Sequence, residues 1–156
     1  MGLSIMAVSG LQKIKCLYNG DMEPTDPQTG FILENTVKVI QNSGFCSQFD
    51  DLENLSRYSY TRIKYCYDAS YSAYNRWREA LAKLAGYPYS DLEEFTGHQI
   101  GAFDVECGPF HELVCFSDCE GTIGPKTSAK LYQDFCDFQD RANLSEDVAW
   151  IKTITP

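Results

Sequence analysis

The stretch YSYTRIKYCYDASYSAYNRWREALAKLAGYP, residues 58–88, decides the fold class of this chain. Residues 58–67 combine aromatic and branched side chains, and apolar and polar positions alternate near their end, which predicts a β-strand. From Ser72 to Ala85 the apolar residues recur at helical spacing, with Ser72 as the expected N-cap and Gly86 just beyond the last turn. A strand that leads directly into an amphipathic helix indicates an α+β fold.

Within the predicted helix, the side chains divide into a core face and a charged face. The core face consists of Tyr74, Trp77, Leu81 and Leu84. Arg78 falls at the edge of this face, near Tyr71 and Asn75, and is therefore expected to be buried or to face a ligand. On the opposite side, the order of Glu79 and Lys83 favours an i, i+4 ion pair.

Apolar spacing predicts further elements on both sides of this segment. Residues 32–40 present one helical face, and residues 126–142 form the last predicted helix. The segments 3–8 and 110–114 each fit either a helix or a short strand. We therefore expect a single domain over residues 1–156, with about four helices packed on a small sheet.

The chain of 156 residues carries a formal charge of −9 and seven cysteines. Because no basic stripe is present that would displace counterions from a nucleic-acid duplex, direct duplex binding is not expected. An acidic surface does suit a basic protein partner. No apolar run approaches the roughly 20 residues that span a bilayer, and the first residues lack a basic leader. We expect a cytoplasmic protein with reduced thiols and no membrane contact.

A second informative segment is SDCEGTIGPKTS, residues 117–128, which leads into the last predicted helix. It superficially resembles a calcium loop, but Phe116 and Thr127 stand where the first and twelfth ligands belong, so no metal is expected. The segment ends at a helix N-terminus, where unbonded amides and the helix dipole attract anions. Alternatively, Asp118 and Glu120 cap helix ends and hold the loop closed.

Together, the two segments predict a pocket for a small polar or anionic ligand such as a nucleotide. Tyr71 would stack on the ligand, Asn75 would form hydrogen bonds to it, and Arg78 would pair with its charge. The predicted ligand-binding residues are Tyr71, Ser72, Asn75, Arg78, Ser117, Asp118, Glu120, Gly121, Gly124 and Ser128. The alternative for the helix start is a polar cap above an aromatic core stripe. No cofactor is assigned.

The chain has two histidines, His98 and His111. Every fourth residue of one stretch is a possible zinc ligand, namely Cys107, His111, Cys115 and Cys119, a spacing that lines one face of a continuous helix. Zinc ligands come more often as close CxxC or CxxH pairs, so structural zinc is not expected. A cysteine beside a histidine also suits nucleophilic catalysis, although an inert buried thiol is the more common arrangement.

Two blocks of the sequence resemble an uncharacterised family of small phage and bacterial proteins. They are SYSAYNRWREALAKLAGYP from Ser70 and GPFHELVCFSDCEGTIGPKTSAKLYQDF from Gly108. The first residues, MGLSIMAVS, resemble that family more loosely, since Ser4 stands where its members have Asp. The resemblance implies a phage-type accessory protein and no particular chemistry.

Three functions are compatible with these features. The first is a binding protein without catalysis that takes a small polar or anionic ligand in the predicted pocket. The second is an acidic inhibitor that binds a host or defence protein through its surface charge. The third is a hydrolase that uses His111, Asp118 and Glu120, with or without a divalent ion.

Overall fold

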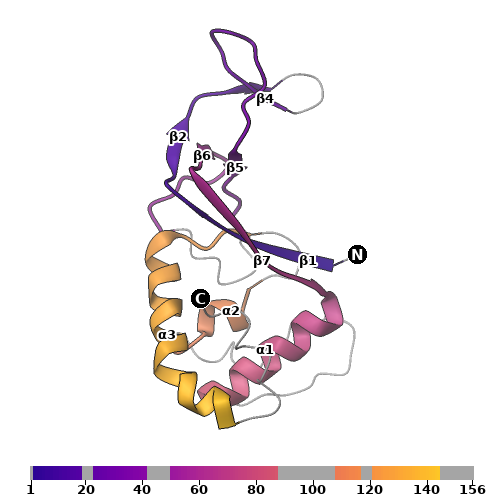
Figure 1. Cartoon of the computed structure of the whole chain (residues 1–156), viewed down its shortest axis with the longest axis vertical. Coiled ribbons are helices and arrows are strands. Elements are labelled where there is room, and N and C mark those ends of the chain that lie inside the picture. The colour runs from indigo at the N-terminus through magenta and orange to yellow at the C-terminus, as the bar shows by residue number, and fades with distance from the viewer. Residues whose placement is uncertain (1, 19–22, 42–49, 88–107, 117–120, 145–156) are drawn as a thin grey trace.

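The computed structural model describes residues 2–18, 23–41, 50–87, 108–116 and 121–144 (Figure 1). Within these ranges lie the strands β1 (Gly2–Ser9), β2 (Gln12–Ile14), β3 (Leu17–Tyr18), β4 (Pro24–Thr25), β5 (Thr36–Lys38), β6 (Arg57–Ser59) and β7 (Arg62–Ser70). The helices are α1 (Tyr71–Ala85), α2 (His111–Val114) and α3 (Pro125–Leu144). The α+β class is confirmed.

Strands β1 and β7 pair as a long antiparallel ribbon, which connects the three helices to the small strands β2–β6 (Figure 1). Its register runs from Gly2 opposite Ser70 to Ser9 opposite Arg62, with an irregularity after Ile5. Strand β7 continues directly into α1, so the end of the ribbon that holds Gly2 and Ser70 packs against the helices. The other end leads away from them.

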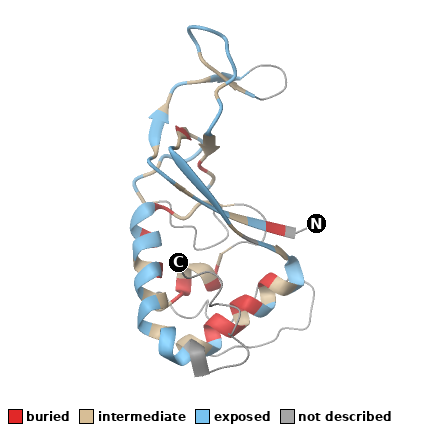
Figure 2. Cartoon of the chain, in the orientation of Figure 1, coloured by how far each residue is buried: buried red, intermediate tan, exposed pale blue. Residues whose placement is uncertain are grey.

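The helical body, which we define as α1, α2 and α3 with their connecting described residues, contains the main core. Figure 2 shows buried residues along the inner side of α1 and around α2. Phe110 is fully buried, and its ring centroid lies 4.9 Å from that of Phe135 and 5.3 Å from that of Phe138. The core cluster comprises Leu3, Tyr74, Trp77, Ala80, Leu81, Ala82, Phe110, Val114 and Cys115. None of the described helices is long and apolar enough to cross a bilayer.

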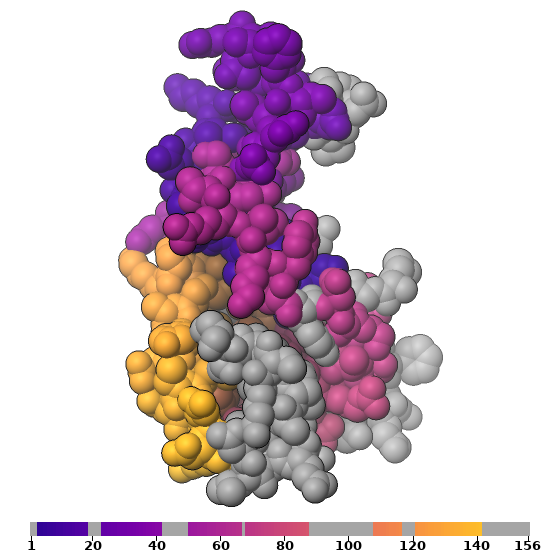
Figure 3. Space-filling view, in the orientation of Figure 1, coloured from indigo at the N-terminus to yellow at the C-terminus, as the bar shows by residue number. Residues whose placement is uncertain are grey.

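The β-arm, which we define as residues 10–18, 23–41 and 51–61, extends from the opposite end of the ribbon (Figures 1 and 3). It contains the three-stranded antiparallel sheet β2-β6-β5 and the small pair β3-β4. Val39 and Tyr58 are its only buried core side chains among the described residues. The arm therefore has far less core than the helical body.

The predicted helix at residues 32–40 is wrong. Asn35 has a φ of 52°, which interrupts any helix, and Thr36–Lys38 form β5 against β6. The β-branched residues Thr36 and Val37 suit a strand as well as a helix. Pairing of this segment with residues 57–59 selects the strand. The described residues consequently contain three helices instead of about four, and three small sheets instead of one.

Other local predictions fare better. Residues 3–8 form a strand, and residues 111–114 form a single helical turn. Gly86 ends α1 in the left-handed conformation, with a φ of 81°, as expected. The N-cap is Ser70 and not Ser72, because Oγ of Ser70 accepts the amide hydrogen of Ala73 at 3.3 Å.

Candidate functional site

Arg78 lies in the contact between α1 and the chain that follows α2. The residue is only 1% exposed. Its Nη1 donates a hydrogen bond to the carbonyl oxygen of Phe116 at 3.0 Å, and its Nη2 donates to Oδ1 of Asn75. The guanidinium carbon lies 4.9 Å from the ring centroid of Tyr74, a cation–π arrangement. Protein groups therefore surround this charge.

Asn75 and Arg78 are thus brought together, as the predicted pocket requires, but they bond to each other and to the main chain. This pair fastens α1 to residue 116, and ligand binding by either residue stays a prediction. Tyr71 and Ser72 lie in the first turn of α1, and Tyr71 is 37% exposed. Oγ of Ser72 lies 3.1 Å from Oγ of Ser70, within the cap of the helix.

The N-terminus of α3 binds an anion that the chain itself supplies. Oδ2 of Asp50 accepts the amide hydrogens of Lys126 at 2.7 Å and Thr127 at 3.0 Å. Oδ1 of Asp50 accepts the hydroxyl of Thr127 at 2.9 Å. Ser128 uses its amide in a helical hydrogen bond to the carbonyl of Gly124. The amides at this helix end, which were expected to be free for a ligand, therefore donate to a side-chain carboxylate 76 residues away in the sequence.

Gly121 has a packing role in the described structure. A Cβ atom at this position would lie 2.6 Å from Cζ of Phe116, so only glycine lets the ring approach this closely. Ser117, Asp118 and Glu120 lie outside the described residues. Of the predicted pocket residues that the structure describes, Asn75, Arg78 and Gly121 contact other protein groups, whereas Tyr71 stays exposed.

His111, the first residue of α2, and Cys115, the residue that caps its C-terminus, form a buried pair. Nε2 of His111 lies 3.5 Å from Sγ of Cys115, with exposures of 7% and 0%. This contact matches the spacing noted in the sequence, but burial separates both groups from solvent. The hydrolase prediction stays untested, because Asp118 and Glu120 lie outside the described residues.

A charged network surrounds Lys130 beneath α2. Its Nζ donates to the carbonyl oxygen of Gly108 at 2.5 Å and to Oε2 of Glu112 at 2.6 Å, and it lies 2.9 Å from Oδ2 of Asp134. Oδ2 of Asp134 also accepts the amide hydrogen of Phe110 at 2.9 Å. Partial burial lowers the pKa of Lys130, but the hydrogen bonds and charges of Glu112 and Asp134 outweigh it and hold that pKa above its ordinary value.

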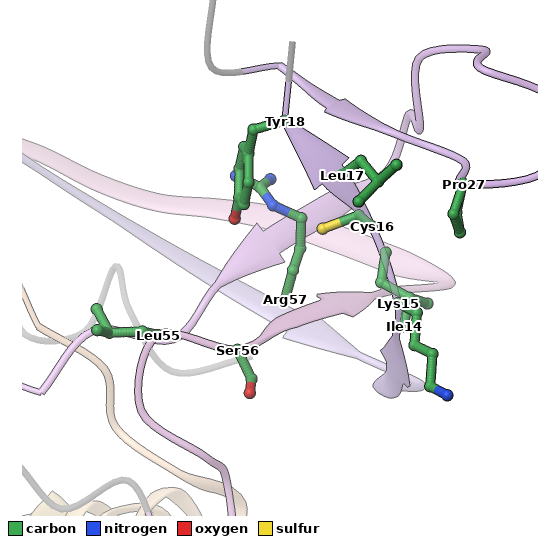
Figure 4. A pocket seen from close by; sticks show the side chains of 9 residues that line it. All are labelled: Ile14, Lys15, Cys16, Leu17, Tyr18, Pro27, Leu55, Ser56 and Arg57. Carbon is green, nitrogen blue, oxygen red and sulfur yellow. The ribbon is translucent and has the colours of Figure 1, made fainter.

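The β-arm contains an open groove of about 470 Å³ (Figure 4). Its lining residues are Ile14, Lys15, Cys16, Leu17, Tyr18, Pro27, Leu55, Ser56 and Arg57. Arg57 and Tyr18 lie together at one side, with the guanidinium carbon 5.7 Å from the ring centroid, whereas Leu17 and Pro27 lie at the other. The groove combines an aromatic ring, apolar side chains and cations.

The charge of this groove is opposite to that of the chain. Among the described residues, Lys15 and Arg57 line it and no carboxylate does, although the chain as a whole carries −9. Nη1 of Arg57 donates to Oγ1 of Thr36 at 2.8 Å, which fixes the guanidinium over Tyr18. The groove therefore favours an anion that also has an apolar or flat part.

Sequence reasoning missed this groove. A weak signal exists in KIKCLY, residues 13–18, where lysines alternate with apolar side chains. The second cation, Arg57, comes from β6, which pairs with β2 and places Arg57 opposite Ile14, and its guanidinium reaches the ring of Tyr18 from there.

Comparisons with known proteins add no relative. No family model, no curated protein and no solved structure matches the chain.

Proposed function

We propose that this chain is a binding protein without catalysis that takes a small anionic ligand, such as a nucleotide, in the groove of the β-arm. The observation that carries the proposal is the placement of Lys15 and Arg57 around an aromatic and apolar groove in a strongly acidic chain. This keeps the ligand class expected from the sequence and moves its site.

Each part of the groove has a physical role in this proposal. The guanidinium of Arg57 contacts the anionic group, and Lys15, whose ammonium points away from Tyr18 and Arg57 (Figure 4), adds attraction at longer range. Tyr18 is 47% exposed and offers a ring for stacking on a flat base. Leu17, Pro27 and Leu55 supply apolar contact, which orients a ligand that is charged at one end only.

Titration calorimetry with AMP and ATP tests the proposal. At about 0.15 M salt, exposed charges more than about 8 Å from the ligand are screened, so a local contact can be separated from net charge. We expect Lys15→Ala to weaken binding about three- to fivefold. Lys64→Ala, on an exposed part of β7, removes the same charge outside the groove and should leave binding unchanged.

A third variant separates the groove from the pocket expected from the sequence. Tyr71→Ala removes the exposed ring at the start of α1 and leaves the groove intact. Weaker binding in Tyr71→Ala with unchanged binding in Lys15→Ala would place the ligand at α1. Absence of binding by both nucleotides would contradict the proposed function itself.

A further inference from the structure

Two cations lie side by side on the three-stranded sheet of the β-arm, at the border of the groove. In the β2-β6-β5 sheet, Arg57 is paired with Ile14 on one side and with Lys38 on the other. Side chains of directly paired residues project to the same face of a sheet, so Ile14, Arg57 and Lys38 share one face. Ile14 and Arg57 line the groove. Lys38 therefore lies one strand beyond the wall that Arg57 forms.

The next row of this sheet face is polar and uncharged. Gln12, Ser59 and Thr36 pair across the same three strands, two residues away from the first row. Nη1 of Arg57 donates to Oγ1 of Thr36 at 2.8 Å, which agrees with both rows lying on one face. The sequences of β2, β5 and β6 contain no Asp or Glu. The strands themselves therefore bring no carboxylate to the two cations.

The neighbouring carboxylates of the β-arm are bonded elsewhere or lie outside the sheet. Glu53 forms an ion pair with Lys13, which is paired with Tyr58 on the opposite face. Oδ1 of Asp26 accepts the amide hydrogens of Gln28 and Thr29 within its own turn.

Glu34 is exposed and precedes β5, and a φ of 52° at Asn35 turns the chain between Glu34 and the strand. The ion pairs between described residues involve Lys13, Lys83, Lys126 and Lys130. Within the described part of the chain, Arg57 and Lys38 therefore have no ion-pair partner.

Arg57 and Lys38 thus face each other without an anion between them. Like charges directly opposite each other destabilise a strand pair. Nε of Arg57 is also buried and has no hydrogen-bond partner among the described residues. An anion that contacts both side chains would remove the repulsion, and it needs more than one negative group to do so.

We infer that the ligand of the groove is a nucleoside di- or triphosphate, with its first phosphate at Arg57 and its terminal phosphate at Lys38. The inference rests on the proposed function and names the ligand class of the same site. The ring centroid of Tyr18 lies 5.7 Å from the guanidinium carbon of Arg57, which places the base next to the first phosphate. Neighbouring strands lie about 4.8 Å apart, a step that a polyphosphate chain can span from β6 to β5.

The net charge of the chain makes this preference specific. ATP is more negative than AMP, and the chain carries −9, so the overall field of the protein disfavours ATP relative to AMP. Tighter binding of ATP must then come from cations close to the added phosphates. Lys38 is the cation that the sheet places next to Arg57.

Titration calorimetry with AMP, ADP and ATP tests the inference, at about 0.15 M salt and without divalent ions, which would neutralise the phosphates. We expect ATP to bind about tenfold more tightly than AMP. Lys38→Ala should weaken ATP binding about five- to tenfold and change AMP binding less than about twofold. Lys38→Arg keeps the positive charge and should keep most of the preference for ATP.

Lys13→Ala is the matched control, because it removes the same charge from the opposite face of the same sheet. The side chains of Lys13 and Glu53 are 52% and 63% exposed, so the loss of their ion pair costs little stability. This variant should keep the affinities for AMP and ATP. Urea unfolding without ligand adds a second measurement, in which Lys38→Ala should be as stable as the wild type or more stable, since one of two facing cations is gone.

Three results would overturn the inference and leave the proposed function standing. They are equal affinity of the wild type for AMP and ATP, a preference for ATP that survives in Lys38→Ala, and an equal loss of that preference in Lys13→Ala. A lower urea midpoint of ligand-free Lys38→Ala, with AMP and ATP binding weakened alike, would assign Lys38 a structural role and also overturn it. If none of the three nucleotides binds, the proposed function fails and the inference fails with it.

Discussion

At the scale of single residues, burial decides how Arg78 acts. Its position on the helix makes it either a ligand-facing or a buried charge, and the structure shows it buried with bonds to Asn75 and Phe116. Removal of the buried guanidinium would take the hydrogen-bond donor away from the carbonyl oxygen of Phe116 and from Oδ1 of Asn75. The loss of these two bonds destabilises the fold.

We therefore expect Arg78→Ala to lower the free energy of unfolding by about 2–4 kcal/mol. Arg76→Ala, on the exposed side of the same helix, should change it by less than about 0.5 kcal/mol. Urea unfolding followed by circular dichroism measures both. Equal stability of the two variants would contradict a structural role for Arg78.

At the scale of elements, α3 begins where a distant carboxylate caps it. Asp50 bonds to two amides and one hydroxyl of the first turn, and Lys126 forms an ion pair with Asp51 at 2.6 Å. The side chains of Lys126 and Asp51 are 69% and 75% exposed, so this second contact is worth little. The capping bonds of Asp50 join the helical body to the chain that leads into the β-arm.

Asp50→Ala should consequently lower the free energy of unfolding by about 1–2 kcal/mol. Asp50→Asn should cost less, because the amide oxygen can still accept and Asn tolerates the φ of 54° at this position. Asp51→Ala is the matched control and should stay within about 0.5 kcal/mol of the wild type. If Asp51→Ala were as unstable as Asp50→Ala, the loss of one negative charge, and not the loss of the capping bonds, would explain both results.

At the scale of the whole molecule, the Lys130 network ties α3 to α2 and to residues 108–110. Because the folded pKa of Lys130 is raised, its contribution to stability is complete below the ordinary value of 10.5. The contribution is then lost as pH rises through the folded pKa. The network should therefore matter at neutral pH and fade in strongly alkaline solution.

The prediction concerns the difference in urea midpoint between the wild type and Lys130→Met. This difference should be constant up to about pH 10 and should shrink at higher pH, as the ammonium of the wild type loses its proton. Lys64→Met provides the control for loss of one exposed ammonium. If the difference in urea midpoint stayed the same in strong alkali, the charge of Lys130 would not be what stabilises the fold through this network.

How far the sequence predicts this molecule depends on the distance between the interacting residues. The spacing of Tyr74, Trp77 and Leu81 predicts α1 and its buried face, because a helix is determined by contacts three and four residues apart. The expected ion pair of Glu79 with Lys83 is present at 2.7 Å. These features are local.

The helix expected at residues 32–40 fails for the opposite reason. Its apolar spacing is compatible with two structures, and pairing of Thr36–Lys38 with Arg57–Ser59 selects the strand. The groove is missed in the same way, because Lys15 and Arg57 lie far apart in sequence and belong to different segments.

The sequence by itself determined the α+β class, α1, most of α3 and the acidic charge, since composition and short-range periodicity are sufficient for each of them. The tertiary structure decided that Asp50 caps α3, that Arg78 bonds to Phe116 and that cations line a groove in the arm. Each of these joins residues tens of positions apart, and such partners are selected by packing and strand pairing, which no local pattern encodes.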